Sequence, residues 1–208
     1  MDGPMIEIIS QKRVVPVITI AESAKAKDLA DCLVEAGLPI AEITLRTIEG
    51  LKAIERAATN PTLLVGAGSL RNADDAKAAI AAGARFLVSA GFSREIAHEA
   101  TNNNVPYFPG IATPTEIIQA LDAGINSVKF FPAETLGGLA ALKAISAPFP
   151  GVSFMPTGGI TPANAPKYLE FSPVLAVGGS WMVAKELIDS GDFSTISTLV
   201  REAVRMCE

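Results

Sequence analysis

Lys129 lies inside Ser127–Phe131, an otherwise apolar segment that predicts a buried strand. A strand covered on both faces is normally a near-continuous apolar run, and an ammonium placed there loses its hydration. Burial favours the neutral form of an amine, and a neutral amine can attack a carbonyl group to form a Schiff base. The alternative is a structural lysine whose long side chain reaches the rim of the sheet. Lys129 is therefore a candidate nucleophile, although this segment alone leaves both interpretations open.

A second polar set lies on one face of another expected strand, residues 41–46. Side chains alternate along a strand, so Glu42, Thr44 and Arg46 face one way, whereas Ile43 and Leu45 face the other. A half-exposed antiparallel strand would also show this pattern. Two opposite charges and a hydroxyl pack poorly inside a sheet, and they are groups that bind a substrate or transfer its protons.

Strands and helices alternate about every 20 to 25 residues, which is the spacing of βα units. The expected strands are Val14–Ile20, Ala41–Arg46, Thr62–Gly68, Phe86–Gly91, Val105–Gly110, Ser127–Pro132, Val152–Gly158 and Val174–Gly179. Helical periodicity is found between them, for example in Ser23–Ala36, Ala73–Ala82, Pro114–Ala123 and Leu139–Ile145, and in a final helix over Asp192–Met206. Alanine–glycine pairs predict three helix ends, and Thr113-Pro114 and Thr161-Pro162 predict two helix starts.

Strict βα alternation predicts a parallel sheet. About eight units favour an α/β fold of the (β/α)8 TIM-barrel type, formed as a single domain over residues 1–208. An open doubly wound sheet is the alternative, but that fold usually has a glycine-rich turn after its first strand. Here the first strand runs into Ala21-Glu22-Ser23 instead.

The carboxyl ends of barrel strands are where active sites form, and polar residues gather there in this sequence. Ser69 follows the third strand and Thr157 lies near the end of the seventh. Glycine pairs end the last two strands, and such loops often bind phosphate through backbone N–H groups. The expected phosphate ligands are the backbone N–H groups of Gly158, Gly159, Gly178 and Gly179. Tight βα turns without a ligand are the alternative interpretation of these glycines.

The composition excludes several other classes of function. The net charge of −5, without a basic run, argues against nucleic acid and anionic membranes as partners. The N-terminal segment lacks the long apolar stretch of a signal peptide, and no apolar run is long enough to span a membrane. Cys32 and Cys207 are expected to be reduced thiols. The cytoplasm is therefore the expected location. His98 is the only histidine and is expected to be structural or solvent-facing, so neither a histidine-based triad nor a histidine metal cluster is expected.

The aromatic residues are less informative. Phe108, Phe130 and Phe131 are expected to pack rather than to contact a cofactor, and Trp181 either walls the pocket or packs beneath it. No dinucleotide or Walker motif is present.

Seven segments, in order along the chain, resemble the KHG/KDPG aldolases, which act on 2-keto-3-deoxy-6-phosphogluconate. They are VVPVITI at 14–20, EITLRT at 42–47, VGAGSL at 65–70, FPGIATPTE at 108–116, VKFFPAE at 128–134, FMPTGGITPAN at 154–164 and VGGSWMV at 177–183. The resemblance implies a class I pyruvate aldolase on a short TIM barrel, usually trimeric, that needs no metal or organic cofactor and works in carbohydrate metabolism of the Entner–Doudoroff type.

By this resemblance, Lys129 is the Schiff-base lysine, Glu42 is the general acid and base, and Arg46 holds the substrate carboxylate. The two glycine loops and Ser180 would hold the phosphate. The chain departs from the family pattern at Ser69, where a threonine is common, and at Ala90, where a proline is common. Ser69 keeps the hydroxyl, so a hydrogen bond to the carboxylate is retained.

Two other functions stay open. One is the same chemistry on another substrate, such as the galactonate analogue or 4-hydroxy-2-oxoglutarate. The other is a non-catalytic barrel that binds a phosphosugar, which would need the glycine loops but no buried lysine.

Overall fold

The structure, a computed structural model, describes residues 4–207. The strands are β1 Val14–Ile18, β2 Ile40–Thr44, β3 Leu64–Leu70, β4 Leu87–Ser89, β5 Tyr107–Phe108, β6 Gly110–Ile111, β7 Ser127–Phe130, β8 Ser153–Phe154 and β9 Val177–Gly179. The helices are α1 Pro4–Lys12, α2 Ala26–Glu35, α3 Gly50–Ala57, α4 Ala73–Ala81, α5 Arg94–Asn102, α6 Pro114–Asp122, α7 Gly138–Ser146, α8 Ala165–Leu169, α9 Lys185–Ser190 and α10 Phe193–Cys207, with 3-10 turns at Ser23–Lys25 and Trp181–Val183.

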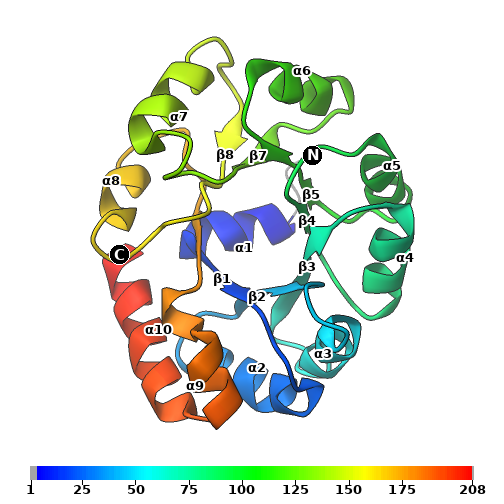
Figure 1. Cartoon of the computed structure of the whole chain (residues 1–208), viewed down its shortest axis with the longest axis vertical. Helices are drawn as coiled ribbons and strands as arrows, with labels where there is room; N and C mark the ends of the chain where they lie inside the picture. Colours follow the sequence, from blue (N-terminus) through cyan, green and yellow to red (C-terminus); the bar gives the residue numbers. More distant parts are fainter. Residues whose placement is uncertain (1–3, 208) are drawn as a thin grey trace.

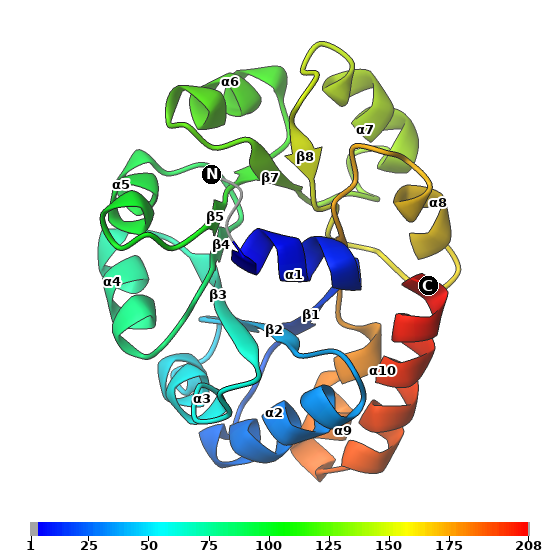
Figure 2. The same cartoon turned by 180° about the vertical axis from the view of Figure 1, so that it is seen from behind.

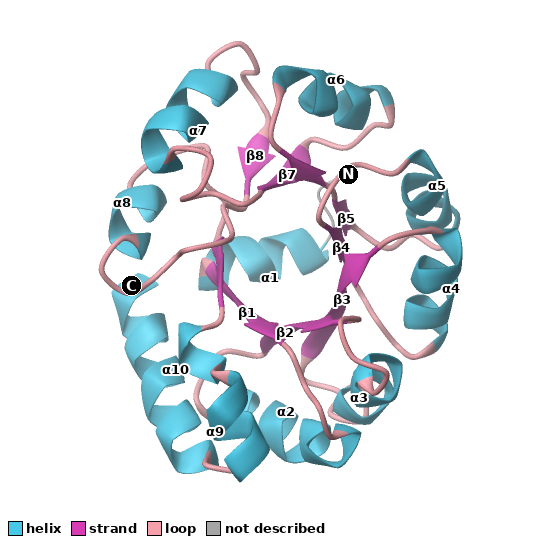
Figure 3. Ribbon diagram, in the orientation of Figure 1, coloured by secondary structure: helices cyan, strands magenta, loops and turns pink. Residues whose placement is uncertain are grey.

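The strands form two parallel sheets that curve around a common axis, with α2 to α10 outside them (Figures 1 and 3). One sheet has the order β5-β4-β3-β2-β1-β9, and the other has the order β6-β7-β8. Parallel pairing and βα alternation confirm the predicted α/β class. In this fold the carboxyl ends of the strands lie at one end of the axis, where the polar residues were expected to meet.

The core has an inner and an outer layer because each strand is covered on both faces. β1 and β2 are buried at every position. The inner cluster includes Val15, Ile40 and Leu64, together with Phe86 and Phe108, whose rings pack edge to face at 6.2 Å between centroids. The outer cluster joins the opposite strand faces to the helices.

Helix α1, which was not predicted, lies across one opening of the ring of strands (Figure 2). Its Ile9 belongs to the inner cluster, and Met5 and Ile6 pack against that cluster. The amino ends of the strands are therefore covered by α1.

Several local predictions are confirmed. Thr113 caps α6 in a capping box with Glu116. Gly37, Gly83 and Gly124 follow helix ends with positive φ angles of 88°, 101° and 75°.

The helix start predicted at Thr161-Pro162 is wrong. Helix α8 begins at Ala165, after Asn164. The intervening residues form a turn in which the Thr161 N–H donates to Asn164 Oδ1 at 2.8 Å, and the Asn164 amide donates to the Gly159 carbonyl at 3.0 Å. The asparagine side chain thus holds the Thr161 N–H and the Gly159 carbonyl within this turn, and the loop after Gly159 is longer than expected.

Candidate active site

Lys129 and Glu42 meet inside the ring of strands. The Lys129 Nζ lies 3.2 Å from Glu42 Oε1, and the two side chains are only 5% and 0% exposed. Lys129 comes from β7 and Glu42 from β2, which belong to different sheets. The prediction that these two polar residues face the interior is confirmed, and the distance is short enough for direct proton transfer between them.

Space for the Glu42 carboxylate is made by the neighbouring strand β3. A Cβ added at Gly68 would lie 2.2 Å from Glu42 Oε1, far inside van der Waals contact. The other carboxylate oxygen, Oε2, is buried and has no hydrogen-bond partner among residues 4–207. A buried, unpaired carboxylate oxygen is rare in a packed core, so Oε2 is an acceptor available to a bound molecule.

Arg46 and Ser69 form a second pair near the same end of the strands. The Arg46 Nε–H donates to Ser69 Oγ at 3.0 Å. Ser69 has a positive φ angle of 61°, an uncommon conformation for a non-glycine residue that directs its hydroxyl toward this contact. A guanidinium fixed in this way still has donors for the two oxygens of a carboxylate.

A cavity of about 600 Å³ opens beside these residues. Its lining includes Arg46, Phe131, Thr157, Ser180 and both glycine pairs, that is Gly158, Gly159, Gly178 and Gly179. Phe131 connects this cavity to the buried pair, since its ring centroid lies 5.4 Å from the Lys129 Nζ. The structure therefore places Arg46, which follows β2, on one cavity with the predicted residues of the last two strand ends. The Lys129–Glu42 pair lies behind Phe131 and is not part of the cavity wall.

The glycines of the two loops are required for different reasons. Gly158 and Gly159 have positive φ angles of 99° and 77°, which residues with a Cβ atom rarely adopt. At Gly178 a Cβ would lie 2.3 Å from Thr157 Oγ1, so this glycine makes room for the threonine. At Gly179 a Cβ would lie 1.9 Å from the Trp181 ring.

The clash at Gly179 changes how a variant there should be interpreted. A Cβ on a phosphate-binding glycine would ordinarily crowd the bound anion directly. The structure shows that the added atom would first displace Trp181, which lines the cavity. An alanine at this position would therefore report on the position of the tryptophan as well as on phosphate binding.

Glu134 packs against the Gly158–Gly159 loop and hydrogen-bonds to its backbone. The Glu134 N–H donates to the Gly158 carbonyl at 3.1 Å, and a Cβ on Gly159 would lie 2.7 Å from the Glu134 Cβ. The Tyr168 hydroxyl donates to Glu134 Oε1 at 2.5 Å. Burial, followed by the hydrogen bond to Glu134, raises the pKa of Tyr168 well above its usual range.

Sequence reasoning missed some residues of the site. Thr19 and Lys185 line the cavity, and Phe131 lines it rather than serving only as packing. Trp181, which was left undecided, is a cavity wall. Phe131 could have been identified because it shares the strand face of Lys129, whereas the position of Lys185 depends on how the last loop folds.

The remaining candidates lie away from the cavity or carry little chemistry. His98 is largely exposed, with 72% of its side chain accessible, as expected for a solvent-facing residue. Cys32 and Cys207 are free thiols, and burial raises the pKa of both. Within residues 4–207, no cluster of three or more His, Cys, Asp or Glu side chains is arranged to hold a metal ion, and no helix is long and apolar enough to cross a membrane.

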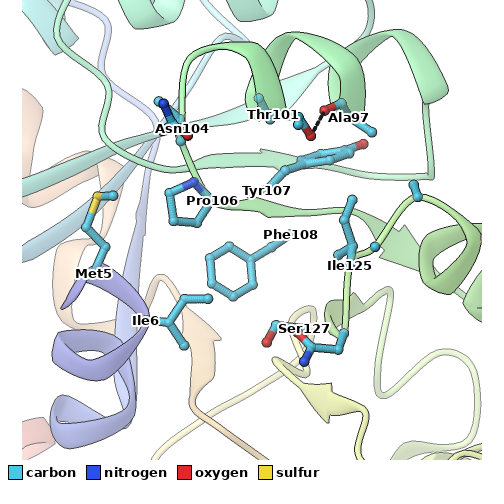
Figure 4. Close-up of a pocket in the computed structure, with 15 residues that line it drawn as sticks. Met5, Ile6, Ala97, Thr101, Asn104, Pro106, Tyr107, Phe108, Ile125 and Ser127 are labelled. Carbon is cyan, nitrogen blue, oxygen red and sulfur yellow. Dashed lines mark hydrogen bonds between the residues drawn. The ribbon is translucent and has the colours of Figure 1, made fainter. Parts of the chain in front are cut away.

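A second cavity, of about 370 Å³, lies near the amino ends of β5 and β7. Figure 4 shows Ile6 of α1 and Phe108 of β5 at its wall. Its lining is mainly apolar and includes neither Lys129 nor Glu42. It is therefore separate from the candidate active site.

Known proteins share both the sequence and the arrangement of this chain. The family model described as KDPG and KHG aldolase matches residues 5–199. A 2-dehydro-3-deoxy-phosphogluconate aldolase of Pseudomonas aeruginosa is 44% identical over 93% of this chain and 89% of its own length. A KHG/KDPG aldolase of Escherichia coli is 40% identical over 95% of this chain and 93% of its own.

Solved structures agree with these sequence matches. The KDPG aldolase of Legionella pneumophila, crystallised with pyruvate captured as a covalent carbinolamine intermediate, superimposes with a TM-score of 0.92 at 39% identity, covering 98% of this chain and 99% of that one. Because the family model and the relatives extend over nearly the whole chain, this protein belongs to the KDPG and KHG aldolase family.

Proposed function

We propose that this protein is a class I aldolase that cleaves 2-dehydro-3-deoxy-6-phosphogluconate into pyruvate and glyceraldehyde 3-phosphate. The observation that carries the proposal is the buried contact of 3.2 Å between Lys129 Nζ and Glu42 Oε1, beside a cavity with two glycine loops. A barrel that only bound a phosphosugar would have no use for a buried lysine next to a carboxylate, since both groups are costly to desolvate.

Lys129 acts as the nucleophile. Transfer of its proton to Glu42 leaves a neutral amine, which adds to the C2 ketone of the substrate to give a carbinolamine. Glu42 then gives this proton to the carbinolamine hydroxyl, which leaves as water, so that an iminium ion forms and Glu42 is again a carboxylate. The positive nitrogen accepts the electron pair of the C3–C4 bond when that bond breaks.

Glu42 acts as the general acid and base. Its Oε2 is buried and unpaired within residues 4–207, so it can accept the proton of the C4 hydroxyl as the C3–C4 bond breaks. Glyceraldehyde 3-phosphate leaves, and an enamine remains on Lys129. Glu42 returns a proton to C3 of the enamine, and hydrolysis of the resulting iminium releases pyruvate and regenerates the amine.

The substrate ends are held by different groups. Arg46, fixed by Ser69, binds the carboxylate through paired N–H donors. The N–H groups of the loops at Gly158-Gly159 and Gly178-Gly179, with the Ser180 hydroxyl, bind the phosphate. Thr157 lies between the two loops and lines the cavity where the chain of the substrate would lie.

A second substrate, 4-hydroxy-2-oxoglutarate, fits the same chemistry. It carries a ketone and a C4 hydroxyl at the same positions, and its cleavage gives pyruvate and glyoxylate. The dual name of the Escherichia coli relative supports this activity.

We also propose that the two sheets form one closed eight-stranded barrel and that residues 1–208 are a single domain. Two observations support closure. β5 and β6 follow each other directly across Pro109, and bridges between Phe154 and Val174 and between Thr157 and Gly178 link the segments around β8 and β9. The topology then matches that of a barrel with its site at the carboxyl ends.

The family resemblance supports a homotrimer in the cytoplasm. Exposed apolar side chains on α3, on the loop before it and on α6 offer surface for contacts between subunits, namely Ile48, Leu51, Ile118 and Leu121. Light scattering coupled to gel filtration measures the mass directly, and a monomeric mass would contradict the trimer.

The activity is tested by following pyruvate release from each substrate with lactate dehydrogenase. Wild-type protein is expected to release pyruvate from both compounds. Lys129→Met keeps the length of the side chain but removes the amine, so it should lose nearly all turnover while its circular dichroism spectrum stays unchanged. Absence of pyruvate release by the wild type, or substantial turnover by a folded Lys129→Met variant, would overturn the proposal.

A further inference from the structure

A second cation, Lys185, lines the active-site cavity. It is the first residue of α9, and its side chain is 47% exposed. Among the lining residues within 4–207, Arg46 and Lys185 are the two cationic residues and Glu186 is the acidic one. The lining therefore carries a second cationic residue besides Arg46, on the helix that follows Gly178, Gly179 and Ser180 in the chain.

The Lys185 ammonium is held in place by Asp189, one helical turn away, through an ion pair with Oδ2. Asp189 is itself fixed, since its main-chain carbonyl accepts a hydrogen bond from the Lys25 Nζ at 2.5 Å. An ammonium has three N–H donors, and one contact to Asp189 leaves others available. The contact to Asp189 therefore does not use all the donors of Lys185.

Apart from Arg46, which is assigned to the substrate carboxylate, Lys185 is the one cationic residue among the lining residues within 4–207. The glycine N–H groups and the Ser180 hydroxyl are neutral donors, whereas a phosphate monoester carries nearly two negative charges at neutral pH. A nearby ammonium would stabilise that charge and favour phosphorylated over unphosphorylated substrates. Glu186 follows Lys185 directly, and adjacent helix residues point in different directions, so it need not face the same anion.

We propose that Lys185 is a specificity residue that binds the substrate phosphate and that Asp189 is its positioning residue. This inference rests on the proposed function, because it assigns a further contact to the phosphorylated substrate of the same site. It also assigns to Lys185 no part in the bond-breaking steps.

The test compares two substrates in Lys185→Gln, which removes the charge and keeps much of the side-chain length. The KM for 2-dehydro-3-deoxy-6-phosphogluconate should rise about fivefold, the scale of a partly exposed ion pair. The kcat, and both constants for unphosphorylated 4-hydroxy-2-oxoglutarate, should change little. Lys185→Arg should restore most of the affinity, and the difference between wild type and Lys185→Gln should shrink as sodium chloride is raised.

Lys27→Gln is the matched control. Lys27 forms an equivalent pair with Asp31 four residues later on α2, is 61% exposed and does not belong to the cavity lining. This variant should behave as the wild type does with both substrates. An unchanged KM for the phosphorylated substrate in Lys185→Gln, or equal losses on both substrates, would overturn the role of Lys185.

Inorganic phosphate separates failure of this inference from failure of the proposed function. Phosphate should inhibit cleavage of 4-hydroxy-2-oxoglutarate by the wild type, and it should inhibit Lys185→Gln less strongly. If the wild type cleaved only the unphosphorylated substrate, the proposed main substrate would be wrong, while this inhibition would still decide the Lys185 contact. Equal inhibition of wild type and variant would overturn that contact even in a fully active aldolase.

Discussion

Gly68→Ala is the most specific perturbation of the proposed general base because it moves the carboxylate without replacing either charged residue. The added Cβ would lie 2.2 Å from Glu42 Oε1 and 2.8 Å from the carboxylate carbon. Ordinary contact begins near 3.4 Å, so the carboxylate must move by about 1 Å. The displaced carboxylate would no longer make its contact of 3.2 Å with the Lys129 Nζ.

A displacement of about 1 Å in a catalytic group typically lowers the rate by roughly 10²-fold. We therefore expect the kcat of Gly68→Ala to fall by about that factor, with the pyruvate-release assay as the measurement. Gly91→Ala is the matched control, because a Cβ there meets no atom within 4 Å, and its kcat should be close to that of the wild type.

Thermal unfolding followed by circular dichroism must accompany both variants. The kcat values are compared at a temperature where each protein is folded, because partial unfolding would also lower the measured rate. A folded Gly68→Ala variant with wild-type kcat would refute the reasoning, since it would show that the position of the Glu42 carboxylate does not limit turnover.

Three further outcomes follow from the site. Glu42→Gln should lower kcat by roughly 10²-fold or more, within the range for acid–base groups, and an unchanged kcat would assign the proton transfer to another residue. Activity should survive exhaustive EDTA treatment because Lys129 supplies the electron sink, and loss that a divalent ion restores would instead indicate metal-dependent chemistry. Because the pKa of Tyr168 is raised in the folded protein, its contribution to stability is present below the unfolded value near 10 and is lost as the pH rises above it. The melting temperature of Tyr168→Phe should therefore decline less steeply above pH 10 than that of the wild type, and parallel declines would contradict this account.

The strands could be predicted because each has a short β-branched or aromatic core between turn residues. Two polar positions of the site could also be predicted, because Lys129 and Glu42 interrupt strand segments that would otherwise be apolar. The alternation of side chains along this segment correctly predicted that Glu42 is buried. Their contact across the ring depends on which strands face each other, and the sequence indicates this only through the fold class and the family resemblance.

Other features depend on side-chain contacts that have no local signal. The start of α8 was misplaced because Asn164 accepts from the Thr161 N–H, although the Thr-Pro pair alone is typical of a helix start. Helix α1 is short, and its place across the ring depends on packing of Ile9 against the inner cluster. The steric need for glycine at position 68 comes from Glu42 on the neighbouring strand, a contact that has no signal in the local sequence.

The most direct test of the central claim is reduction of the protein with borohydride in the presence of pyruvate, followed by peptide mass mapping. If Lys129 forms the Schiff base, the reduced protein should carry one three-carbon adduct, located on Lys129, and its activity should be lost in proportion to the labelling. Lys129→Met should remain unlabelled. An adduct on another lysine, or no adduct in a protein that still cleaves the substrate, would contradict the account.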